Sequence, residues 1–186
     1  ASCLVGSEMC IRDRENILVL TNAKYKDLCL NQLSQIQSDN ILCEPAMRNT
    51  AACIAYASFK IYNLNQKANI IVAPSDHLIL DEESFLAIAS NCLDVVCKHD
   101  VLLTLGINPS KPETGYGYIQ YTSENLPSSN EIFKVKTFTE KPNQELALNF
   151  LNSGDFLWNS GMFVWSAKSI SLAYRKHLHD MYAPPQ

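Results

Sequence analysis

Asn69-Ile70-Ile71-Val72-Ala73-Pro74-Ser75-Asp76-His77 is the stretch from which the fold of this chain is most directly inferred. Its apolar, β-branched first half predicts a buried strand, and the proline and polar residues after it predict the end of that strand. Ligands bind beyond the carboxyl ends of the strands in open α/β sheets, so Asp76 is a candidate ligand-binding residue. The alternative is that residues 74–76 form a turn without a ligand and that Asp76 caps a helix.

Strands and helices alternate on both sides of this stretch. Residues 17–21, 41–43 and 101–107 are apolar runs of strand length. Apolar residues recur at helical spacing in three segments, 25–36, 51–62 and 85–96. Because strands joined by helices form right-handed crossovers, we expect an α/β fold with a mostly parallel sheet and helices on both faces.

The pattern changes after Pro109. Residues 116–121 and 132–139 have strand character, with a polar segment and no helix between them. They predict an antiparallel excursion from the parallel sheet. A helix over 144–151, a strand over 161–165 and a last helix over 170–181 follow.

The composition is that of an ordinary globular protein. Of the 186 residues, 18% are charged and 47% are hydrophobic, and the formal net charge is -4. Since no cluster of Lys and Arg is present, we expect no binding to nucleic acid or to a membrane. No apolar run is long enough to cross a bilayer and no signal peptide is recognisable, so we expect a cytoplasmic protein. The cysteines are odd in number and form no C-x-x-C pair, which predicts free, buried thiols.

Residues 1–14 show neither helical nor strand periodicity. Their sequence, ASCLVGSEMCIRDR, resembles translated sequencing adapter, and we interpret the segment as non-native or disordered. We therefore expect it to contribute neither to the fold nor to the function.

The segment from Glu44 to Ala51 joins a strand end to a helix start. A carboxylate held by the following Pro45 can accept from both the N1 and N2 donors of guanine, and a helix N-terminus favours phosphate charge. The alternative is simple capping, with Asn49 as the N-cap and Arg48 solvated.

Three further clusters stand at strand ends or strand starts. In residues 112–119, two glycines flank a tyrosine, which suits close approach of the backbone to a sugar but also an ordinary turn. Glu140-Lys141-Pro142 offers an acceptor for hydroxyl groups and a cation for phosphate, or a solvated charge pair. Residues 158–163 place Asn159 and Ser160 beside a tryptophan, which suits a carbohydrate pocket or a β-turn.

These motifs, in this order, resemble the mannose-1-phosphate guanylyltransferases of the bacterial type that is often fused to a mannose-6-phosphate isomerase domain. The resemblance covers residues 16 to about 182 and implies a partial Rossmann-like nucleotidyltransferase domain over residues 15–186. The implied reaction converts GTP and mannose 1-phosphate to GDP-mannose and pyrophosphate, with Mg²⁺ as cofactor. The resemblance leaves open whether an isomerase or a β-helix domain follows and whether the intact protein is a homo-oligomer.

The resemblance also implies roles for individual residues. Asp76 would hold the metal, and Lys141 would neutralise the sugar phosphate. The implied nucleotide-binding residues are Glu44, Arg48, Asn49, Thr50, Pro74 and Ser75, of which Glu44 and Asn49 would select guanine. The implied sugar-binding residues are Gly117, Tyr118, Glu140, Asn159 and Gly161.

Two motifs of that family are missing. The family begins with a glycine-rich loop that cradles the triphosphate, whereas Gly6 is the only glycine before Asn16 here. A second metal-binding aspartate of the family is also absent before Gln186. We therefore expect a fragment with very low or no activity. The alternatives are a relative with a different sugar or base, and a non-catalytic sugar-nucleotide-binding domain.

Overall fold

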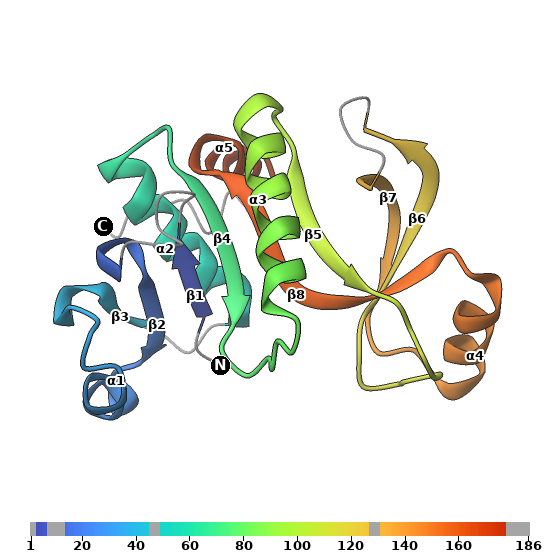
Figure 1. The fold of residues 1–186 in the computed structure, drawn as a ribbon, viewed down its shortest axis with the longest axis horizontal. Helices are drawn as coiled ribbons and strands as arrows, with labels where there is room; N and C mark the ends of the chain where they lie inside the picture. Colours follow the sequence, from blue (N-terminus) through green and yellow to red (C-terminus); the bar gives the residue numbers. More distant parts are fainter. Residues whose placement is uncertain (1–2, 7–13, 45–48, 127–130, 178–186) are drawn as a thin grey trace. The chain divides into compact units, whose positions relative to one another are not determined.

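The computed structural model describes residues 3–6, 14–44, 49–126 and 131–177 (Figure 1). The chain divides into two units, a first unit of residues 1–103 with 163–186 and a second unit of residues 104–162. Strands β5 (Leu102–Ile107) and β8 (Phe156–Ser166) each contribute residues to both units.

The first unit is built on a sheet with the strand order β3-β2-β1-β4-β8. Its other strands are β1 (Cys3–Gly6), β2 (Leu18–Asn22), β3 (Ile41–Glu44) and β4 (Asn69–Pro74). β2 pairs with β3 in parallel, and β1 runs antiparallel to both β2 and β4. Hence β2, β3 and β4 all point the same way, whereas β1 and β8 run opposite to them.

Strand β1 differs from the expectation that residues 1–14 stay outside the fold. Its backbone pairs with Leu18 to Leu20 on one side and with Ile71 to Pro74 on the other. A strand that lies between two others forms backbone hydrogen bonds on both sides. Side-chain periodicity in a segment of four residues does not predict these bonds. In this structure Cys3–Gly6 is therefore part of the sheet, and the interpretation of residues 1–14 as non-native stays a prediction.

Helices cover both faces of this sheet. The first unit contains α1 (Lys26–Gln32), α2 (Asn49–Leu64), α3 (Glu82–Lys98) and α5 (Ala167–His177), with short 3₁₀ turns at 14–16, 23–25 and 38–40. α2 packs against α5 on one face, and α3 packs on β4 from the other (Figure 1). The predicted α/β fold with helices on both faces is confirmed.

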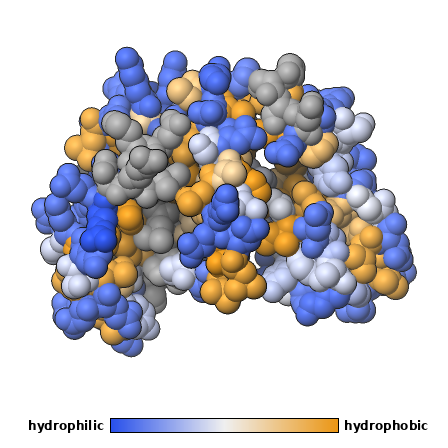
Figure 2. Space-filling view, in the orientation of Figure 1, coloured by the Kyte–Doolittle hydropathy of each residue, from blue (hydrophilic) through white to orange (hydrophobic). Residues whose placement is uncertain are grey.

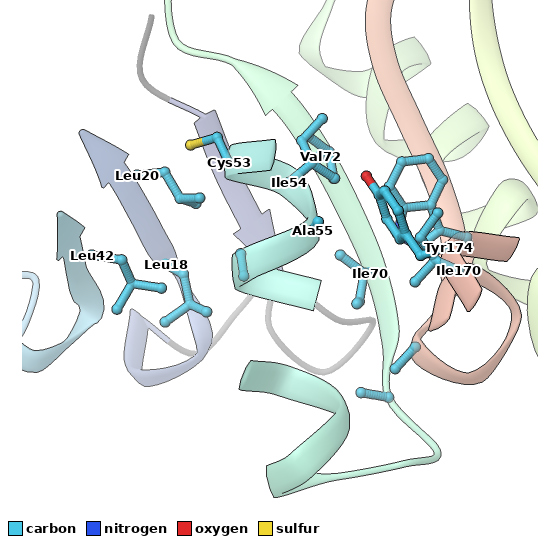
Figure 3. Close-up of a cluster of buried hydrophobic side chains, with 14 residues drawn as sticks. Leu18, Leu20, Leu42, Cys53, Ile54, Ala55, Ile70, Val72, Ile170 and Tyr174 are labelled. Carbon is cyan, nitrogen blue, oxygen red and sulfur yellow. The ribbon is translucent and has the colours of Figure 1, made fainter. Parts of the chain in front are cut away.

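A cluster of buried side chains holds α2 and α5 to the strands (Figure 3). Leu18, Leu20, Ile70 and Val72 alternate along β2 and β4 and therefore lie on the same face of the sheet. Ile54 of α2 packs against this face in the same cluster. Residues between them, such as Val19, are also buried, which explains why the predicted strands read as continuous apolar runs.

The second unit contains the predicted antiparallel excursion. β6 (Tyr118–Asn125) pairs antiparallel with β7 (Phe133–Thr139) on one side and with β8 on the other, while β5 pairs with β8. β8 begins five residues before the predicted start at Gly161, which has φ +72° inside the strand. The Asn-Ser-Gly sequence indicated a turn, but the single glycine takes up the irregularity and the strand continues.

Helix α4 (Gln144–Ser153) closes a smaller core in this unit. Its Ala147 and the side chains of Tyr118, Phe156 and Trp158 are buried together, with Phe150 packed against them. The rings of Phe150 and Phe156 stack with their centroids 4.0 Å apart. This core lies next in sequence to two of the predicted sugar-binding motifs and so gives them a rigid support.

The surface carries two departures from expectation. Although β5 is apolar, Leu102 and Ile107 are exposed, because β5 pairs only with β8 among the described strands. Among the described residues five cysteines are free as predicted, but of these only Cys53 and Cys92 are buried, Cys29 and Cys43 are partly buried, and Cys97 is exposed. Figure 2 shows hydrophilic side chains interspersed with apolar ones over the visible face. Among the described helices, none has the length and apolar character that crossing a membrane requires.

Candidate functional site

The first unit carries the predicted metal-binding residue at the end of β4. Pro74 is the last residue of the strand, and Ser75 and Asp76 form the turn after it. The Asp76 side chain is 87% exposed, and its Oδ1 lies 3.5 Å from Nδ1 of His77. The side chain of Asp76 is thus accessible at the carboxyl end of a strand, and its role as a ligand stays a prediction.

The alternative role of Asp76 as a helix cap is wrong. Helix α3 begins at Glu82, and its N-cap is Asp81, whose Oδ1 accepts from the backbone N–H of Ser84 at 3.0 Å. Asp81 Oδ2 also accepts from the Ser84 hydroxyl at 2.7 Å, and these bonds hold the pKa of Asp81 below its usual value. Since Asp81 caps this helix, Asp76 does not, and the alternative that residues 74–76 form a turn without a ligand stays open.

The carboxylate of Asp76 fits a magnesium ion shared with phosphate groups. Mg²⁺ prefers hard oxygen ligands and is commonly held by one or two carboxylates together with substrate phosphates. Among the described residues, no three His, Cys, Asp or Glu side chains are grouped as an all-protein metal site would require.

The predicted guanine-reading segment is only partly described. Glu44 ends β3, paired with Asn22 of β2, and α2 begins at Asn49 followed by Thr50. Arg48 lies outside the described residues. The order of strand end, connection and helix start matches the prediction for this segment.

The second unit brings three of the predicted sugar-binding residues together. The Asn159 backbone N–H donates to the Gly117 carbonyl at 2.8 Å. A Cβ at Gly117 would lie 2.8 Å from Oε2 of Glu140 and 3.6 Å from Cβ of Asn159. Gly117, Glu140 and Asn159 come from three motifs that are distant in the sequence, and they line one small region of this unit.

The side-chain amide of Asn159 has a defined orientation. Its Oδ1 accepts from the backbone N–H of Gly161 at 3.1 Å, and the Thr104 hydroxyl can donate either to the same oxygen at 3.3 Å or to the Met162 carbonyl at 3.2 Å. These bonds do not use Nδ2, which is a donor. The sequence reasoning did not single out Thr104, although a hydroxyl within the apolar run 101–107 is a signal that could have found it.

Lys141 follows Glu140 at the end of β7. Its backbone has φ +41°, the left-handed region that is uncommon for a residue other than glycine. The Nζ of Lys141 lies 3.7 Å from Oε1 of Glu140, and both side chains are largely exposed. An exposed ion pair of this kind contributes little to stability, so the lysine is free to exchange its partner for a phosphate.

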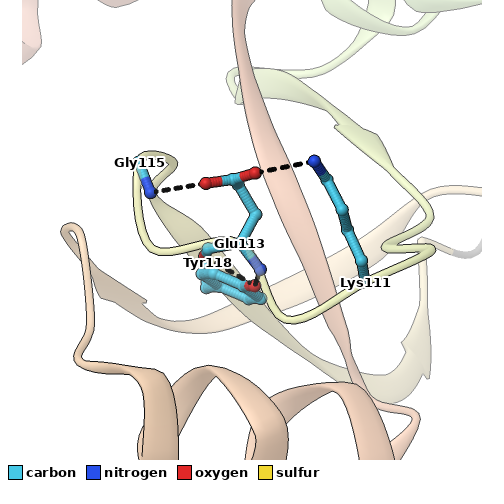
Figure 4. A network of polar contacts seen from close by, with 4 residues as sticks. All are labelled: Lys111, Glu113, Gly115 and Tyr118. Carbon is cyan, nitrogen blue, oxygen red and sulfur yellow. Dashed lines mark hydrogen bonds and ion pairs between the residues drawn. The ribbon is translucent and has the colours of Figure 1, made fainter.

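The loop before β6 is held by a network of polar contacts (Figure 4). Glu113 Oε2 lies 3.0 Å from Nζ of Lys111, and Glu113 Oε1 accepts from the Gly115 backbone N–H at 3.1 Å. The Lys111 contact and then the Gly115 bond lower the pKa of Glu113, and Glu113 in turn raises the pKa of Lys111. Glu113 lies within the motif of residues 112–119 but was not predicted as a site residue.

Tyr118 belongs to the same network through its hydroxyl. The ring is completely buried, and the hydroxyl donates to the Glu113 carbonyl at 2.9 Å and accepts from the Glu113 N–H at 3.0 Å. Since these two bonds occupy the hydroxyl, the predicted contact of Tyr118 with a sugar would have to come from its backbone. Tyr116, which is exposed and contacts Trp158 edge-on at 5.3 Å, is the aromatic side chain of this motif that solvent reaches.

Known proteins resemble this chain in sequence and in fold. A family model described as "Nucleotidyl transferase" matches residues 5–182. A curated mannose-1-phosphate guanylyltransferase of Salmonella montevideo is 35% identical over 179 residues, which cover 89% of this chain and 37% of that protein. The chain thus spans about a third of that relative's length.

Two solved structures resemble the fold. One is titled mannose-1-phosphate geranyltransferase and comes from Thermus thermophilus, with a TM-score of 0.78, 25% identity, and coverage of 91% of this chain and 48% of that one. The other is titled mannose-6-phosphate isomerase from Helicobacter pylori, with a TM-score of 0.72, 32% identity, and coverage of 87% and 59%.

Proposed function

This chain belongs to the nucleotidyl transferase family, and on that premise we propose that it is part of an enzyme that makes GDP-mannose and pyrophosphate from GTP and mannose 1-phosphate. The proposal concerns the whole protein, because the chain spans about a third of the length of its curated relative. It is supported by the name of that relative and by the side chains that the second unit groups together.

The proposed reaction is a phosphoryl-type transfer. A phosphate oxygen of mannose 1-phosphate forms a bond to the α-phosphorus of GTP. The bond from that phosphorus to the oxygen that bridges to the β-phosphate breaks, and pyrophosphate leaves with the electron pair. In reactions of this type the protein contributes mainly positioning and compensation of charge.

The second unit supplies groups for a sugar phosphate. The carboxylate of Glu140 can accept from sugar hydroxyls, and Nδ2 of Asn159 can donate to them. The Gly117 backbone lies beside both, and the exposed ammonium group of Lys141 can neutralise the sugar phosphate. Gly161 supports this arrangement through its bond to Asn159.

The first unit supplies groups for a nucleotide. Asp76 would hold Mg²⁺, which when bound supplies positive charge to the phosphate oxygens. Pro74 and Ser75 precede Asp76 at the end of β4 and are proposed to line the nucleotide. Guanine selection is assigned to Glu44 and Asn49, and Arg48 and Thr50 are assigned to nucleotide binding on the family resemblance.

One observation carries the proposal, namely that Gly117, Glu140 and Asn159 converge although 42 residues separate the first from the last. A glycine, a carboxylate and a side-chain amide next to a lysine provide an acceptor, a donor and a cation. This is the set of groups that a sugar with a phosphate requires.

The test is a thermal-shift titration of this chain with GDP-mannose. The unaltered chain is expected to gain thermal stability with increasing GDP-mannose, and Lys141→Ala is expected to weaken binding by roughly tenfold to a hundredfold, as loss of a charge-assisted bond does. Lys134→Ala is the matched control, because Lys134 is similarly exposed and pairs with Glu124 at 3.3 Å in the same unit. A chain that GDP-mannose does not stabilise, or equal effects of the two variants, would contradict the proposal.

A second titration, with GTP and with dTTP, distinguishes a guanylyltransferase from a relative that uses another base. Binding of GTP in preference to dTTP supports a guanylyltransferase, whereas preference for dTTP indicates a relative with another base. The cytoplasmic location and assembly into a homo-oligomer stay predictions.

A further inference from the structure

The side chain of Glu113 makes its contacts with Gly115 and Lys111 within its own loop. Its carboxylate accepts from the Gly115 N–H at 3.1 Å and pairs with Lys111 at 3.0 Å. The side chain of Glu113 is 27% exposed, whereas that of Lys111 is 67% exposed. Both partners, Lys111 and Gly115, are exposed, and the bond to Gly115 spans the turn that leads to Gly117.

The backbone of Glu113 is tied to the buried core. Both its N–H and its carbonyl bond to the hydroxyl of Tyr118, which is completely buried at the start of β6. Tyr118 therefore anchors both ends of the loop from Glu113 to Gly117. Its hydroxyl holds Glu113, and Gly117 is its neighbour in the chain. The internal shape of the loop depends on the contact between Glu113 and Gly115.

The residue that this loop presents is Gly117. Its carbonyl accepts from the Asn159 N–H at 2.8 Å, and a Cβ there would approach Glu140 to 2.8 Å. The hydrogen bond from Asn159 fixes the Gly117 backbone, whereas the Glu140 carboxylate beside it is the end of an exposed side chain. A displaced loop would move the Gly117 backbone away from both side chains.

We propose that Glu113 is a positioning residue of the sugar site, which acts by accepting the hydrogen bond of the Gly115 N–H and thereby holds the Gly117 backbone beside Glu140 and Asn159. This inference rests on the proposed function of that site. Glu113 itself is not assigned a contact with the substrate.

The test compares Glu113→Ala with Glu113→Gln in binding mannose 1-phosphate and GTP, measured separately by calorimetry on the full chain. Glu113→Ala removes the acceptor and is expected to weaken mannose 1-phosphate binding about tenfold, with GTP binding unchanged. Glu113→Gln keeps a carbonyl oxygen for Gly115 and is expected to restore most of the affinity. Lys111→Met keeps the Gly115 bond, and its effect is expected to be under about threefold.

Glu124→Gln is the matched control, since it removes the charge of an exposed ion pair elsewhere in the same unit. Unchanged mannose 1-phosphate binding in Glu113→Ala would overturn the proposal, as would equal loss of both ligands with a lower melting temperature. An equal loss of mannose 1-phosphate affinity in Glu113→Ala and Glu113→Gln would overturn it as well.

An NMR measurement tests the positioning role of Glu113 separately from the proposed function. If the unaltered chain binds neither ligand, the proposed function fails for this chain. The positioning role is then judged by the amide signals of Gly115 and Gly117, which Glu113→Ala is expected to shift, with faster hydrogen exchange at Gly115. Unchanged signals would overturn the role of Glu113.

Discussion

At the scale of single residues, several hydrogen bonds in the structure differ from those that the short polar motifs suggested. Asp76 was equally compatible with a ligand and a cap until Asp81 was found to cap α3. Tyr118 was predicted to bind sugar, yet its hydroxyl is bonded to Glu113 inside the core. A motif identifies residue types, whereas hydrogen-bond partners depend on neighbours that are distant in the sequence.

Gly117 offers a prediction at this scale. In Gly117→Ala, the new Cβ would lie 2.8 Å from Oε2 of Glu140, the end of an exposed and flexible side chain. We expect the carboxylate to move, so that mannose 1-phosphate binds about tenfold more weakly while the melting temperature changes little. Calorimetry and thermal unfolding measure the two effects.

Gly115→Ala is the control for that variant. Its Cβ would lie 3.4 Å from Oε1 of Glu113, which is ordinary contact, and the backbone N–H is retained. We expect near-normal binding from Gly115→Ala. Equal losses in both variants would show that any added methyl group in this loop impairs binding, and the specific role of Gly117 would be wrong.

At the scale of elements, hydrophobic periodicity predicted the helices and strands because burial of alternating or helically spaced side chains is what holds them to the sheet. The contact between α2 and α5 shows what periodicity does not reveal. The Tyr174 hydroxyl donates to the Ala51 carbonyl at 2.9 Å, across 123 residues of sequence. Burial raises the pKa of Tyr174 to about 12.

Tyr174 therefore makes stability depend on pH in a defined direction. Its folded-state pKa exceeds its usual value of 10, so the contribution is complete below pH 10 and is lost as the pH rises toward 12. We expect Tyr174→Phe to cost about 1 kcal/mol at neutral pH through the lost hydrogen bond, and to reduce the loss of stability between pH 10 and 12. Urea unfolding at several pH values measures both.

Tyr56→Phe serves as the comparison, because Tyr56 lies on α2 but is exposed. Tyr56→Phe is expected to change neither the free energy of unfolding at neutral pH nor the decrease of that free energy at alkaline pH. A Tyr174→Phe variant that loses stability at alkaline pH as steeply as the unaltered chain would contradict the assignment.

At the scale of the whole molecule, the least expected feature is the part that residues 3–6 play. They form β1 between β2 and β4, although the segment that contains them has no periodicity of its own. A central strand contributes through its backbone bonds on both sides, and these are set by the partners that the rest of the chain provides.

Val5→Pro tests whether β1 belongs to the folded sheet. Val5 is paired with Leu18 and with Val72, so its N–H faces a neighbouring strand whichever side it donates to. Proline removes that donor, and we expect a loss of about 1–3 kcal/mol in the free energy of unfolding measured with urea. Val5→Ala keeps the N–H and is expected to cost less; unfolding of Val5→Pro at the same urea concentration as the unaltered chain would exclude β1 from the sheet.

The sequence by itself determined the α/β class, the order of most elements, the antiparallel excursion and the family, because these depend on local periodicity and on ordered motifs. Only the tertiary structure decided that Asp81 rather than Asp76 caps α3, that Tyr118 is buried, and that Gly117 lies against Glu140 and Asn159. The physical reason is that a hydrogen bond or a close approach requires two groups to meet. These groups lie far apart in the sequence, and only the pairing of their strands in the folded chain brings them together.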